Sequence, residues 1–451
     1  MKKLFGTDGI RGEAGLFPLD APTIKTIGSS LATRLKEKLG KSPLIVIGRD
    51  TRESGEWIEQ ALFDGASHAG ADVRSAGVIS TPGVAFLTRS LVADAGVVLS
   101  ASHNPFQDNG IKIFVPSGRK LDEETERLIE RDVFESTTRF PPTTATGASE
   151  PGDEDGLREC YLDFLANEIG KNLSLSGFRI VIDCANGAAS NIAPQLFQRF
   201  GATVTAINNI PDGRNINLDC GSLHTESLQE EVQKQNAALG VALDGDADRS
   251  LFVDGKGQLV NGDGTLWVLA KYLRNQGRLQ GDTVVATVMS NIGLELALKS
   301  QDIELVRTDV GDKYVLEELL RTGTSLGGEQ SGHIIFPELS LAGDGLITTL
   351  CLLSAMNEEG KPLHELTAGF QTYPQILLNV KVKEKQPFDE VATIRKAARH
   401  IETQLGSRGR LLLRYSGTEP LARVMIEGES QSEIESQAQE LAGVIRETLG
   451  S

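Results

Sequence analysis

Cysteine is scarce in this chain and is spread too widely to build cross-links. The 451 residues include four cysteines, Cys160, Cys184, Cys220 and Cys351, with no C-x-x-C pair and no histidine at ligand spacing. Disulfide-stapled domains and zinc sites both depend on closely grouped cysteines. We therefore expect reduced, structural cysteines.

Long apolar runs are also missing. No segment approaches the roughly 18 uninterrupted apolar residues of a membrane-spanning helix. The opening residues, MKKLFGTDGIRG, place a glycine-rich charged stretch where a secretory signal would be apolar. These absences predict a cytoplasmic protein with no membrane partner.

Basic residues are outnumbered, with 45 lysines and arginines against 62 aspartates and glutamates and a formal net charge of -17. Binding to nucleic acid needs a basic surface that displaces counterions. The charge balance argues against a nucleic-acid partner, and an anionic substrate must bind in a locally basic pocket.

The patterning predicts an α/β protein of several domains. Short apolar runs, typical of buried strands, alternate with amphipathic stretches typical of helices. We expect strands at 44–47, 96–99, 180–182, 202–205, 241–243, 251–253 and 283–288, and helices at 21–39, 56–69, 189–200, 266–275 and 313–320. Up to about residue 365 this order predicts mixed, mostly parallel sheets, followed by strands and one long terminal helix.

Breaks in composition suggest where the domains end. A polar stretch rich in Pro and Gly covers 137–155, and further breaks fall at 254–264 and 360–374. We predict three α/β domains over 1–150, 151–254 and 255–367, and a smaller α+β domain over 368–451.

The first loop of chemical interest, SASHNP, follows the strand expected at 96–99. Open α/β sheets build their sites at the carboxyl ends of strands. We expect the Ser102 hydroxyl to be held there and exposed. Ser, Asn and Pro also favour ordinary turns, so this loop alone does not decide between a turn and a site.

The second loop, DGDADR, places Asp244, Asp246 and Asp248 at alternate positions. Three such carboxylates can converge on one hard cation. A calcium-binding EF-hand is the competing interpretation, but its twelfth position would be Gly255, and a strand follows where that motif has a helix. Mg²⁺ fits better, since it retains free positions for phosphoryl oxygens.

Two further loops favour sugar and phosphate binding. GGEQSGH offers Glu329, Ser331 and His333 to sugar hydroxyls, although an isolated histidine is more often a core or surface residue. RYSGTEPLAR brings Arg414 and Arg423 to one turn, which favours a bound anion over an ordinary hairpin because the two guanidinium groups repel each other.

Two cations on glycine-bearing segments, Arg11 and Lys112, could neutralise a phosphoryl group in transit. Taken singly, each would be interpreted as a solvated charge.

Together the motifs FGTDGIRG, SASHNP, DGDADR, GEQSGH and RYSGTEPLARV stand in the order of the α-D-phosphohexomutase superfamily, which the chain resembles over essentially its whole length. Within it, GEQSGH and R-x-SGTEP-x-x-R-V are similar to the bacterial phosphoglucosamine mutases. Phosphomannomutases and phosphoglucomutases typically carry GEMSGH or GEESGG and SNT-type phosphate loops. The resemblance implies four domains around a central cleft, and a homodimer is a family expectation.

The resemblance also implies roles for individual residues. Ser102 would be the phosphoserine and, with Asp244, Asp246 and Asp248, would bind one Mg²⁺ per active site. Arg11, His103, Lys112 and Arg249 would surround the transferring phosphoryl group, with Lys112 as the leading candidate for proton transfer. The sugar would contact Gly328, Glu329, Ser331 and His333, and the other phosphate would contact Arg414, Ser416, Gly417, Thr418 and Arg423.

One departure from the family pattern is Lys313, where the resembling proteins often have arginine in VGDRYV. Lysine lacks the forked guanidinium group. The substrate contact implied at this position is therefore not carried over to Lys313.

The implied activity is interconversion of glucosamine 6-phosphate and glucosamine 1-phosphate through a hexosamine 1,6-bisphosphate, which feeds amino-sugar nucleotide and peptidoglycan precursor synthesis. The alternative within the superfamily is a phosphomannomutase or phosphoglucomutase. A non-catalytic phosphosugar-binding protein is a third reading, disfavoured because the serine, the aspartates and the arginines occur together.

Overall fold

The computed structural model describes residues 3–6, 8–135, 154–416 and 419–450. The chain forms two compact units, Met1–Val288 with Val306–Ala368, and Met289–Leu305 with Gly369–Ser451. No helix among the described residues is long and apolar enough to cross a membrane. All four cysteines are free, as predicted, and burial raises the pKa of the Cys220 and Cys351 thiols to about 12.

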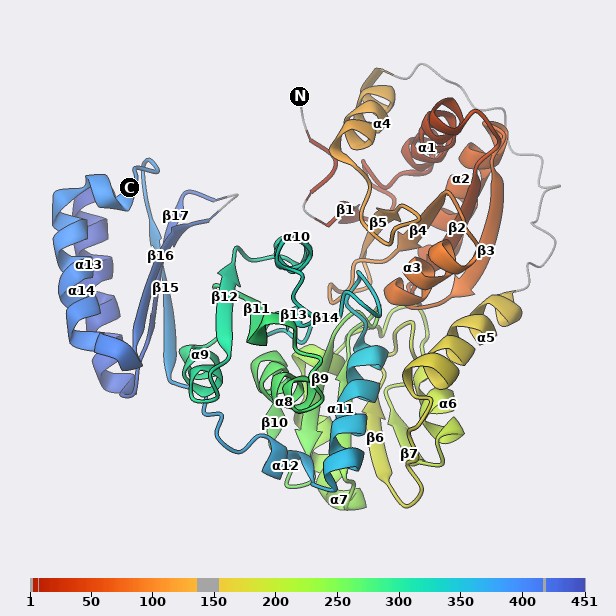
Figure 1. Ribbon diagram of the computed structural model, residues 1–451. Coiled ribbons are helices and arrows are strands. Elements are labelled where there is room, and N and C mark those ends of the chain that lie inside the picture. Colours follow the sequence, from red (N-terminus) through yellow and green to blue (C-terminus); the bar gives the residue numbers. More distant parts are fainter. Residues whose placement is uncertain (1–2, 7, 136–153, 417–418, 451) are drawn as a thin grey trace. The chain divides into compact units, whose positions relative to one another are not determined.

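The first sheet of the larger unit has the strand order β1-β5-β4-β2-β3 (Figure 1). Its strands are β1 (Ile10–Glu13), β2 (Leu44–Arg49), β3 (Asp72–Val78), β4 (Ala95–Leu99) and β5 (Asp108–Phe114), and its helices are α1 (Ala21–Leu39), α2 (Gly55–His68), α3 (Thr81–Ser90) and α4 (Glu123–Glu135). β2 is parallel to β3 and β4, whereas β5 is antiparallel to β1 and β4.

The alternation of side chains along these strands explains the helices on both faces. Ile47 and Val97 point into a core with α1 and α2, where Leu31 and Leu62 are fully buried. On the other face Gly96 allows α3 to approach closely, since a Cβ there would lie 2.0 Å from Thr88 Oγ1. The loop after β4 is therefore fixed by packing on both sides of the sheet.

The second sheet has the order β10-β9-β8-β6-β7 and the same succession of two antiparallel and two parallel pairings, but its edge strand β10 comes last in the chain, whereas β1 comes first. Its elements are β6 (Arg179–Asp183), β7 (Thr203–Ile207), β8 (Leu239–Leu243), β9 (Ser250–Asp254), β10 (Leu259–Val260), α5 (Glu154–Phe164), α6 (Ile192–Arg199) and α7 (Glu226–Gln235). A π-helix, Leu165–Ile169, continues α5, and a short 3₁₀ helix covers Gly221–Leu223.

The third sheet has four strands in the order β12-β11-β13-β14. These are β11 (Thr283–Thr287), β12 (Glu304–Thr308), β13 (Gly327–Gly328) and β14 (Ile334–Ile335), with α8 (Gly262–Asn275), α10 (Asp312–Thr322), α11 (Gly345–Glu359) and α12 (Leu363–Leu366). The helix α9 (Ile292–Lys299) lies in the segment Met289–Leu305 of the smaller unit. The order matches the β7-β6-β8-β9 part of the second sheet, so the three sheets are related as predicted.

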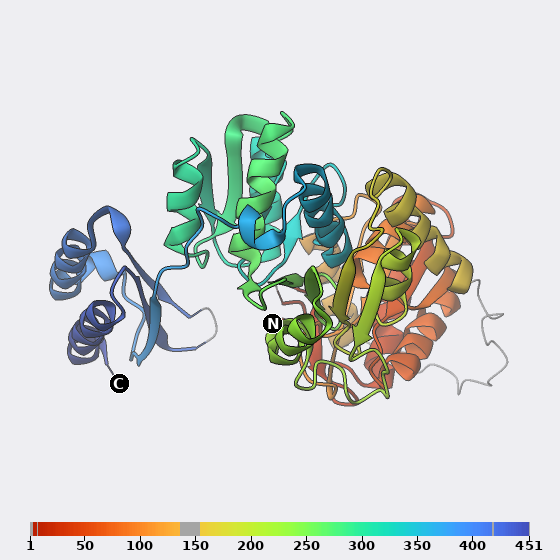
Figure 2. The same cartoon turned by 90° about the horizontal axis from the view of Figure 1, so that it is seen from below.

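The smaller unit is built on an antiparallel sheet in the order β15-β17-β16. Figure 2 shows α13 and α14 side by side on this sheet. The elements are β15 (Gln375–Lys381), α13 (Ala392–Leu405), β16 (Arg410–Tyr415), β17 (Leu421–Glu427) and α14 (Gln431–Leu449). The predicted long terminal helix is confirmed as α14, but α13 was not predicted. Only Ile394 and Ile401 of α13 are buried, and Ala397 and Leu405 pack partly buried against the same core.

The other predicted strands and helices are confirmed, with ends that shift by up to four residues. The sheets are mixed, and each of the first two has as many antiparallel as parallel pairings. The predicted domain boundaries at 150, 254 and 367 remain predictions.

Candidate active site

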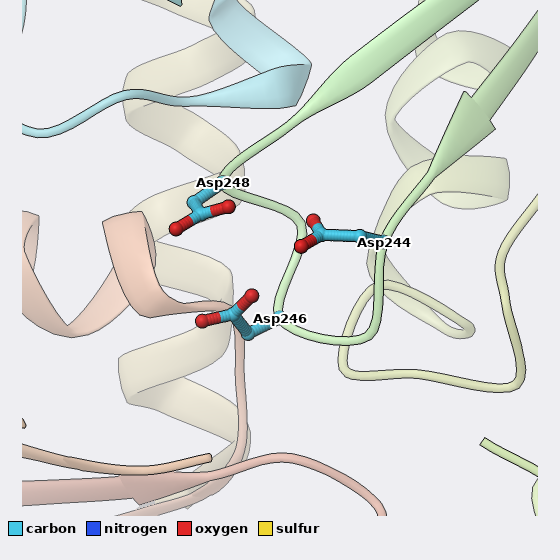
Figure 3. Close-up of side chains that lie close together, drawn as sticks. All are labelled: Asp244, Asp246 and Asp248. Carbon is cyan, nitrogen blue, oxygen red and sulfur yellow. The ribbon is translucent and has the colours of Figure 1, made fainter. Parts of the chain in front are cut away.

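The aspartate loop, residues 244–249, connects the fully buried antiparallel strands β8 and β9. The turn is tight, with Ala247 at a φ of 55°. Ligand oxygens of Asp244, Asp246 and Asp248 all lie within 4.8 Å of one another, and all three side chains are buried. Figure 3 shows the three carboxylates directed toward a common space.

The unmet bonding capacity of this loop fits a divalent cation. The Oδ1 atoms of Asp246 and Asp248 are buried and have no hydrogen-bond partner within the described part of the chain. Burial, together with the charges of Asp248 and Asp246, raises the pKa of Asp244 well above its ordinary value. Hard carboxylate oxygens held this closely suit Mg²⁺, so these residues could hold a metal ion.

Ser102 lies against this loop, in the turn that follows β4. Its backbone is left-handed, with a φ of 52°, and its Oγ donates a hydrogen bond of 2.7 Å to Asp244 Oδ2. Gly245 makes the contact of the two loops possible, because a Cβ there would lie 2.6 Å from the Ser102 carbonyl oxygen. The prediction that the Ser102 hydroxyl is exposed was wrong. The residue is only 1% exposed, since the aspartate loop covers it.

Arg52, which sequence reasoning missed, holds the backbone of the serine loop. Its guanidinium group is fully buried and donates to the carbonyl oxygens of Ser102 and Asn104, each at 2.9 Å, and to that of Pro105. Its Nε donates to Asp50 Oδ2 at 2.9 Å. The available signal was a charged pair directly after the apolar strand 44–47, which is unusual unless the pair has a buried role.

His103 and Arg249 extend the site on one side of Ser102. The Nδ1 atom of His103 lies 3.3 Å from Ser102 Oγ and 3.2 Å from Arg249 Nη1. Burial and the positive charges of Arg249 and Arg11 lower the pKa of His103, which favours the neutral imidazole. Arg249 Nη1 can then donate to Nδ1.

Lys112 is buried on β5 beside the aspartates. Its Nζ donates to Asp246 Oδ2 at 2.8 Å and lies 3.7 Å from Asp248 Oδ2 and 3.5 Å from Asp8 Oδ2. Burial opposes the charged form, but the carboxylates of Asp246, Asp8 and Asp248 outweigh it and raise the pKa of Lys112 well above its ordinary value. The resting side chain is therefore an ammonium ion.

Two residues near Lys112 were not singled out from the sequence. Asp8 accepts a hydrogen bond from Arg11 Nη2 and so links Arg11 to Lys112. Thr81, at the first turn of α3, donates from Oγ1 to Asp246 Oδ2 at 2.6 Å. The FGTDGIRG motif contained Asp8, but only the folded chain pairs it with β5.

The loop between β13 and β14 carries the residues expected to contact the sugar. His333 Nδ1 lies 3.6 Å from Asp248 Oδ2. Burial lowers the pKa of His333, but Asp248 more than compensates and raises it to about 9. The Ser331 Oγ and His333 Nε2 atoms are buried without a hydrogen-bond partner among the residues described. Glu329 Oε1 accepts a hydrogen bond from the Gly311 backbone at 3.2 Å, and Gly328 is buried in β13.

A cavity of about 470 Å³ brings several of these side chains together in the larger unit. It is lined by the predicted residues Arg11, His103, Asp248, Arg249, Glu329 and His333, and by Asp8, Gly311 and Asp312, which were not predicted. Cations from two loops thus face a sugar-binding candidate loop across one cavity, as a phosphosugar site requires.

In the smaller unit, Arg414 and Arg423 are paired residues on the antiparallel strands β16 and β17. Arg414 Nη2 lies 3.8 Å from Met289 Sδ, and Arg423 Nε is buried with no hydrogen-bond partner in the described residues. The Ser416 carbonyl oxygen accepts a hydrogen bond of 2.6 Å from Lys385 Nζ. Gly417 and Thr418 lie outside the described residues.

Lys313 lies on the exposed side of α10. Its Nζ is 3.5 Å from Glu123 Oε1 and 4.0 Å from Glu317 Oε1. Both contacts are with exposed carboxylates.

Comparison with known proteins places the chain in a family. Models of the phosphoglucomutase/phosphomannomutase family match alpha/beta/alpha domain I at residues 2–140, domain II at 159–257, domain III at 261–373 and the C-terminal domain at 377–444. The phosphoglucosamine mutase of Solibacter usitatus is 50% identical over 449 residues, which cover 100% of this chain and 99% of the relative. That of Koribacter versatilis is 47% identical over 100% of this chain and 98% of the relative.

Solved structures have the same fold. A phosphoglucomutase/phosphomannomutase family protein from Burkholderia thailandensis has a TM-score of 0.78 at 23% identity, over 99% of this chain and 98% of that one. The N-acetylphosphoglucosamine mutase of Aspergillus fumigatus, in complex with GlcNAc-6P and magnesium, has a TM-score of 0.65 at 18% identity, over 99% and 96%. This chain therefore belongs to the phosphoglucomutase/phosphomannomutase family and, within it, to the phosphoglucosamine mutases, which are intramolecular phosphotransferases.

Proposed function

We propose that the enzyme interconverts glucosamine 6-phosphate and glucosamine 1-phosphate by passing a phosphoryl group through Ser102. The observation that carries the proposal is the 2.7 Å hydrogen bond from Ser102 Oγ to Asp244 Oδ2, within a triad of carboxylates that can hold a cation. This contact puts the only atom of Ser102 that could carry phosphate next to the candidate metal site.

The cofactor we assign is Mg²⁺, which Asp244, Asp246, Asp248 and an oxygen on phosphorylated Ser102 would hold. The unpartnered Oδ1 atoms of Asp246 and Asp248 support this assignment. When bound, Mg²⁺ would neutralise part of the negative charge on the phosphoryl oxygens. The protein supplies the remaining positive charge through Arg11, Lys112 and Arg249.

In the first transfer, an oxygen of the sugar forms a bond to phosphorus while the bond from phosphorus to Ser102 Oγ breaks. The product is a glucosamine 1,6-bisphosphate. The proton of the sugar hydroxyl ends on Ser102 Oγ. We assign its relay to Lys112, since an ammonium ion can protonate the departing Oγ and regain a proton from the sugar hydroxyl. The bisphosphate then turns over, and Ser102 takes back the other phosphoryl group.

Binding of the sugar is assigned to the loop with Gly328, Glu329, Ser331 and His333. A protonated His333 can donate to sugar hydroxyls, and Ser331 Oγ, which has no partner among the described residues, can donate to or accept from hydroxyl and amine groups. Arg414, Ser416, Gly417, Thr418 and Arg423 are assigned to the phosphate that is not being transferred, because a pair of guanidinium groups is the usual protein ligand for such an anion.

A coupled assay tests this proposal directly. Purified enzyme is given glucosamine 6-phosphate, glucose 6-phosphate or mannose 6-phosphate in turn, with MgCl₂ present. We expect kcat/KM to be highest for glucosamine 6-phosphate and turnover to be lost in Ser102→Ala. A higher kcat/KM for mannose or glucose 6-phosphate would reassign the enzyme to the corresponding mutase, and full turnover by Ser102→Ala would refute the phosphoserine route.

A further inference from the structure

Lys120 joins two aspartates that are far from it in sequence. Its Nζ donates to Asp8 Oδ1 at 2.7 Å and to the two oxygens of Asp312 at 3.0 and 2.9 Å. The lysine stands just beyond β5, Asp8 precedes β1, and Asp312 is the first residue of α10. One ammonium group thus connects segments 112 and 192 residues away from it along the chain.

Through Asp8, Lys120 is linked to Arg11 and Lys112, the cations assigned to the phosphoryl group. The other oxygen of Asp8, Oδ2, accepts from Arg11 Nη2 and lies 3.5 Å from Lys112 Nζ. Asp8 therefore divides its charge between Lys120 on one oxygen and the two cations of the site on the other. The position of Asp8 therefore affects that of Arg11 directly, and it affects that of Lys112 together with Asp246, which lies closer to Lys112 Nζ at 2.8 Å.

On the Asp312 side, the connection leads to the sugar-binding loop. Asp312 follows Gly311, and the Gly311 backbone N–H donates to Glu329 Oε1 at 3.2 Å. Holding the start of α10 thus also holds a donor to Glu329. Lys120 therefore connects Asp8, which contacts the cations near the phosphoryl group, with Asp312, which stands next to the donor to Glu329 in the sugar-binding loop.

The position of these residues in the cavities supports a role beyond surface charge pairing. Asp8, Asp312 and His333 line both the 470 Å³ site cavity and a second cavity of about 560 Å³, whereas Lys120 lines the second one. The ion-paired group is therefore part of the wall between the two cavities.

A solvent-exposed ion pair is screened by water and usually contributes little to stability. The Lys120 side chain is 24% exposed and is shared by two carboxylates from different segments. Burial opposes its charged form, but Asp312 and Asp8 raise the pKa of Lys120, so it stays an ammonium ion. These features favour a fixed bridge over a fluctuating surface pair.

We propose that Lys120 is a positioning residue for phosphoryl transfer, which sets Arg11 and Lys112 through Asp8 and Glu329 through the start of α10. This inference rests on the proposed function. It adds that the correct spacing of the two ends of the site depends on this one ammonium group.

The test compares four variants of the full-length enzyme with wild type: Lys120→Met, Lys120→Arg, Lys120→Met with Asp312→Asn, and the control Arg119→Met. Arg119 is the exposed neighbour, lines the same second cavity and carries the same charge. For each we would measure kcat and KM for glucosamine 6-phosphate, and Tm. We expect Lys120→Met to lower kcat/KM by about 10–100-fold, the range for residues that hold the direct ligands of a site in position. Its Tm should be close to that of Arg119→Met.

Rescue separates positioning from charge. We expect Lys120→Arg to recover most of kcat, since a guanidinium group can also bridge two carboxylates. The double variant, which restores the net charge without the bridge, should not recover kcat. Equal kinetics for Lys120→Met and Arg119→Met, or full recovery in the double variant, would overturn the inference.

Two further outcomes are informative. If Lys120→Met does not fold, Asp312→Asn alone opens the bridge from the other side and should lower kcat, and wild-type kinetics there would overturn the inference. If wild type does not convert glucosamine 6-phosphate at all, the proposed function fails. If wild type converts it and the variants match wild type, only the role of Lys120 fails.

Discussion

The aspartate loop (residues 244–249) and the arginine hairpin, which is formed by β16 and β17, both place charges of one sign close together. The neighbouring residues compensate these charges differently in the two regions. The buried aspartates at 244, 246 and 248 have protein cations around them, with Lys112 Nζ 2.8 Å from Asp246 and His333 3.6 Å from Asp248. In the hairpin, Arg410 is paired with Glu427 and forms a 2.9 Å ion pair, whereas Arg414 is paired with Arg423. Like charges on paired positions destabilise a sheet. We infer that the Arg410–Glu427 end of the hairpin contributes to stability, and the proposal is that the Arg414–Arg423 end binds an external anion.

The largest effect is expected from removing charge in the aspartate loop. Asp246→Asn keeps the shape of the side chain that bonds to Lys112 and Thr81 but removes its negative charge. We expect kcat for glucosamine 6-phosphate to fall by about 100-fold or more, the loss seen when one preorganised electrostatic partner is removed. Magnesium should also raise Tm less than it does for wild type, because a ligand stabilises the state that it binds.

The matched control for this variant is Asp254→Asn, a buried aspartate at the end of β9 that accepts backbone hydrogen bonds from Lys256 and Gln258. It should retain turnover and the magnesium response. Wild-type kcat in Asp246→Asn at the same magnesium concentration would contradict the metal assignment.

A smaller effect is expected in the hairpin, where substitution of Arg423 should change KM and substitution of Arg410 should change stability. Arg423→Met removes a guanidinium group from the proposed phosphate site and a like charge beside Arg414. We expect KM for glucosamine 6-phosphate to rise by about 10–100-fold, from loss of hydrogen bonds to a charged group, with Tm unchanged or higher.

Arg410→Met should do the reverse. It removes the guanidinium group that forms the 2.9 Å ion pair with the fully buried Glu427, which keeps its hydrogen bonds from Asn291 and Ile292, so the unfolding free energy should fall by roughly 3 kcal/mol, while KM changes little. If Arg423→Met lowers Tm and leaves KM alone, the division of the hairpin into a structural and a binding end is wrong.

The smallest effect concerns Asp344, a buried carboxylate compensated by hydrogen bonds from Tyr161, Leu346 and Ile347. Burial raises the pKa of Asp344 from 3.8 to about 6. Because the folded state then binds more protons than the unfolded state between these values, stability should fall as pH rises from about 4 to 6, by on the order of 1 kcal/mol per pH unit.

Asp344→Asn keeps the Oδ1 acceptor of the helix cap, presents an amide N–H to the Tyr161 hydroxyl in place of Oδ2, and should remove this part of the pH dependence. Denaturant unfolding of wild type and variant at several pH values between 4 and 7 measures the difference. Parallel stability curves for the two proteins would show that Asp344 does not titrate in this range.

The sequence was informative where chemistry follows a buried strand. Ser102 and the three aspartates could be found because each loop comes directly after an apolar run, and the fold brings them into hydrogen-bonding distance. The exposure of Ser102 was misjudged because the residues that cover it lie about 140 positions later. A local pattern does not indicate which distant loop will pack against it.

The same reason explains the residues that were missed. Arg52 acts on backbone carbonyls 50 or more positions away, and Asp8 and Lys120 meet only after β5 and α10 are in place. A charged side chain in the sequence looks solvated until its partners are known. The helix α13 was missed because only Ile394 and Ile401 are buried, while Ala397 and Leu405 beside them are only partly covered.

The central claim is that Ser102 carries the phosphoryl group, and intact mass spectrometry tests it most directly. Wild type and Ser102→Ala are purified with magnesium, and their masses are measured before and after incubation with glucosamine 6-phosphate. The account predicts that wild type carries one phosphoryl group that is partly lost to the sugar, and that Ser102→Ala never carries it. A phosphoryl group of the same stoichiometry on Ser102→Ala, or wild-type turnover without any, would contradict the account.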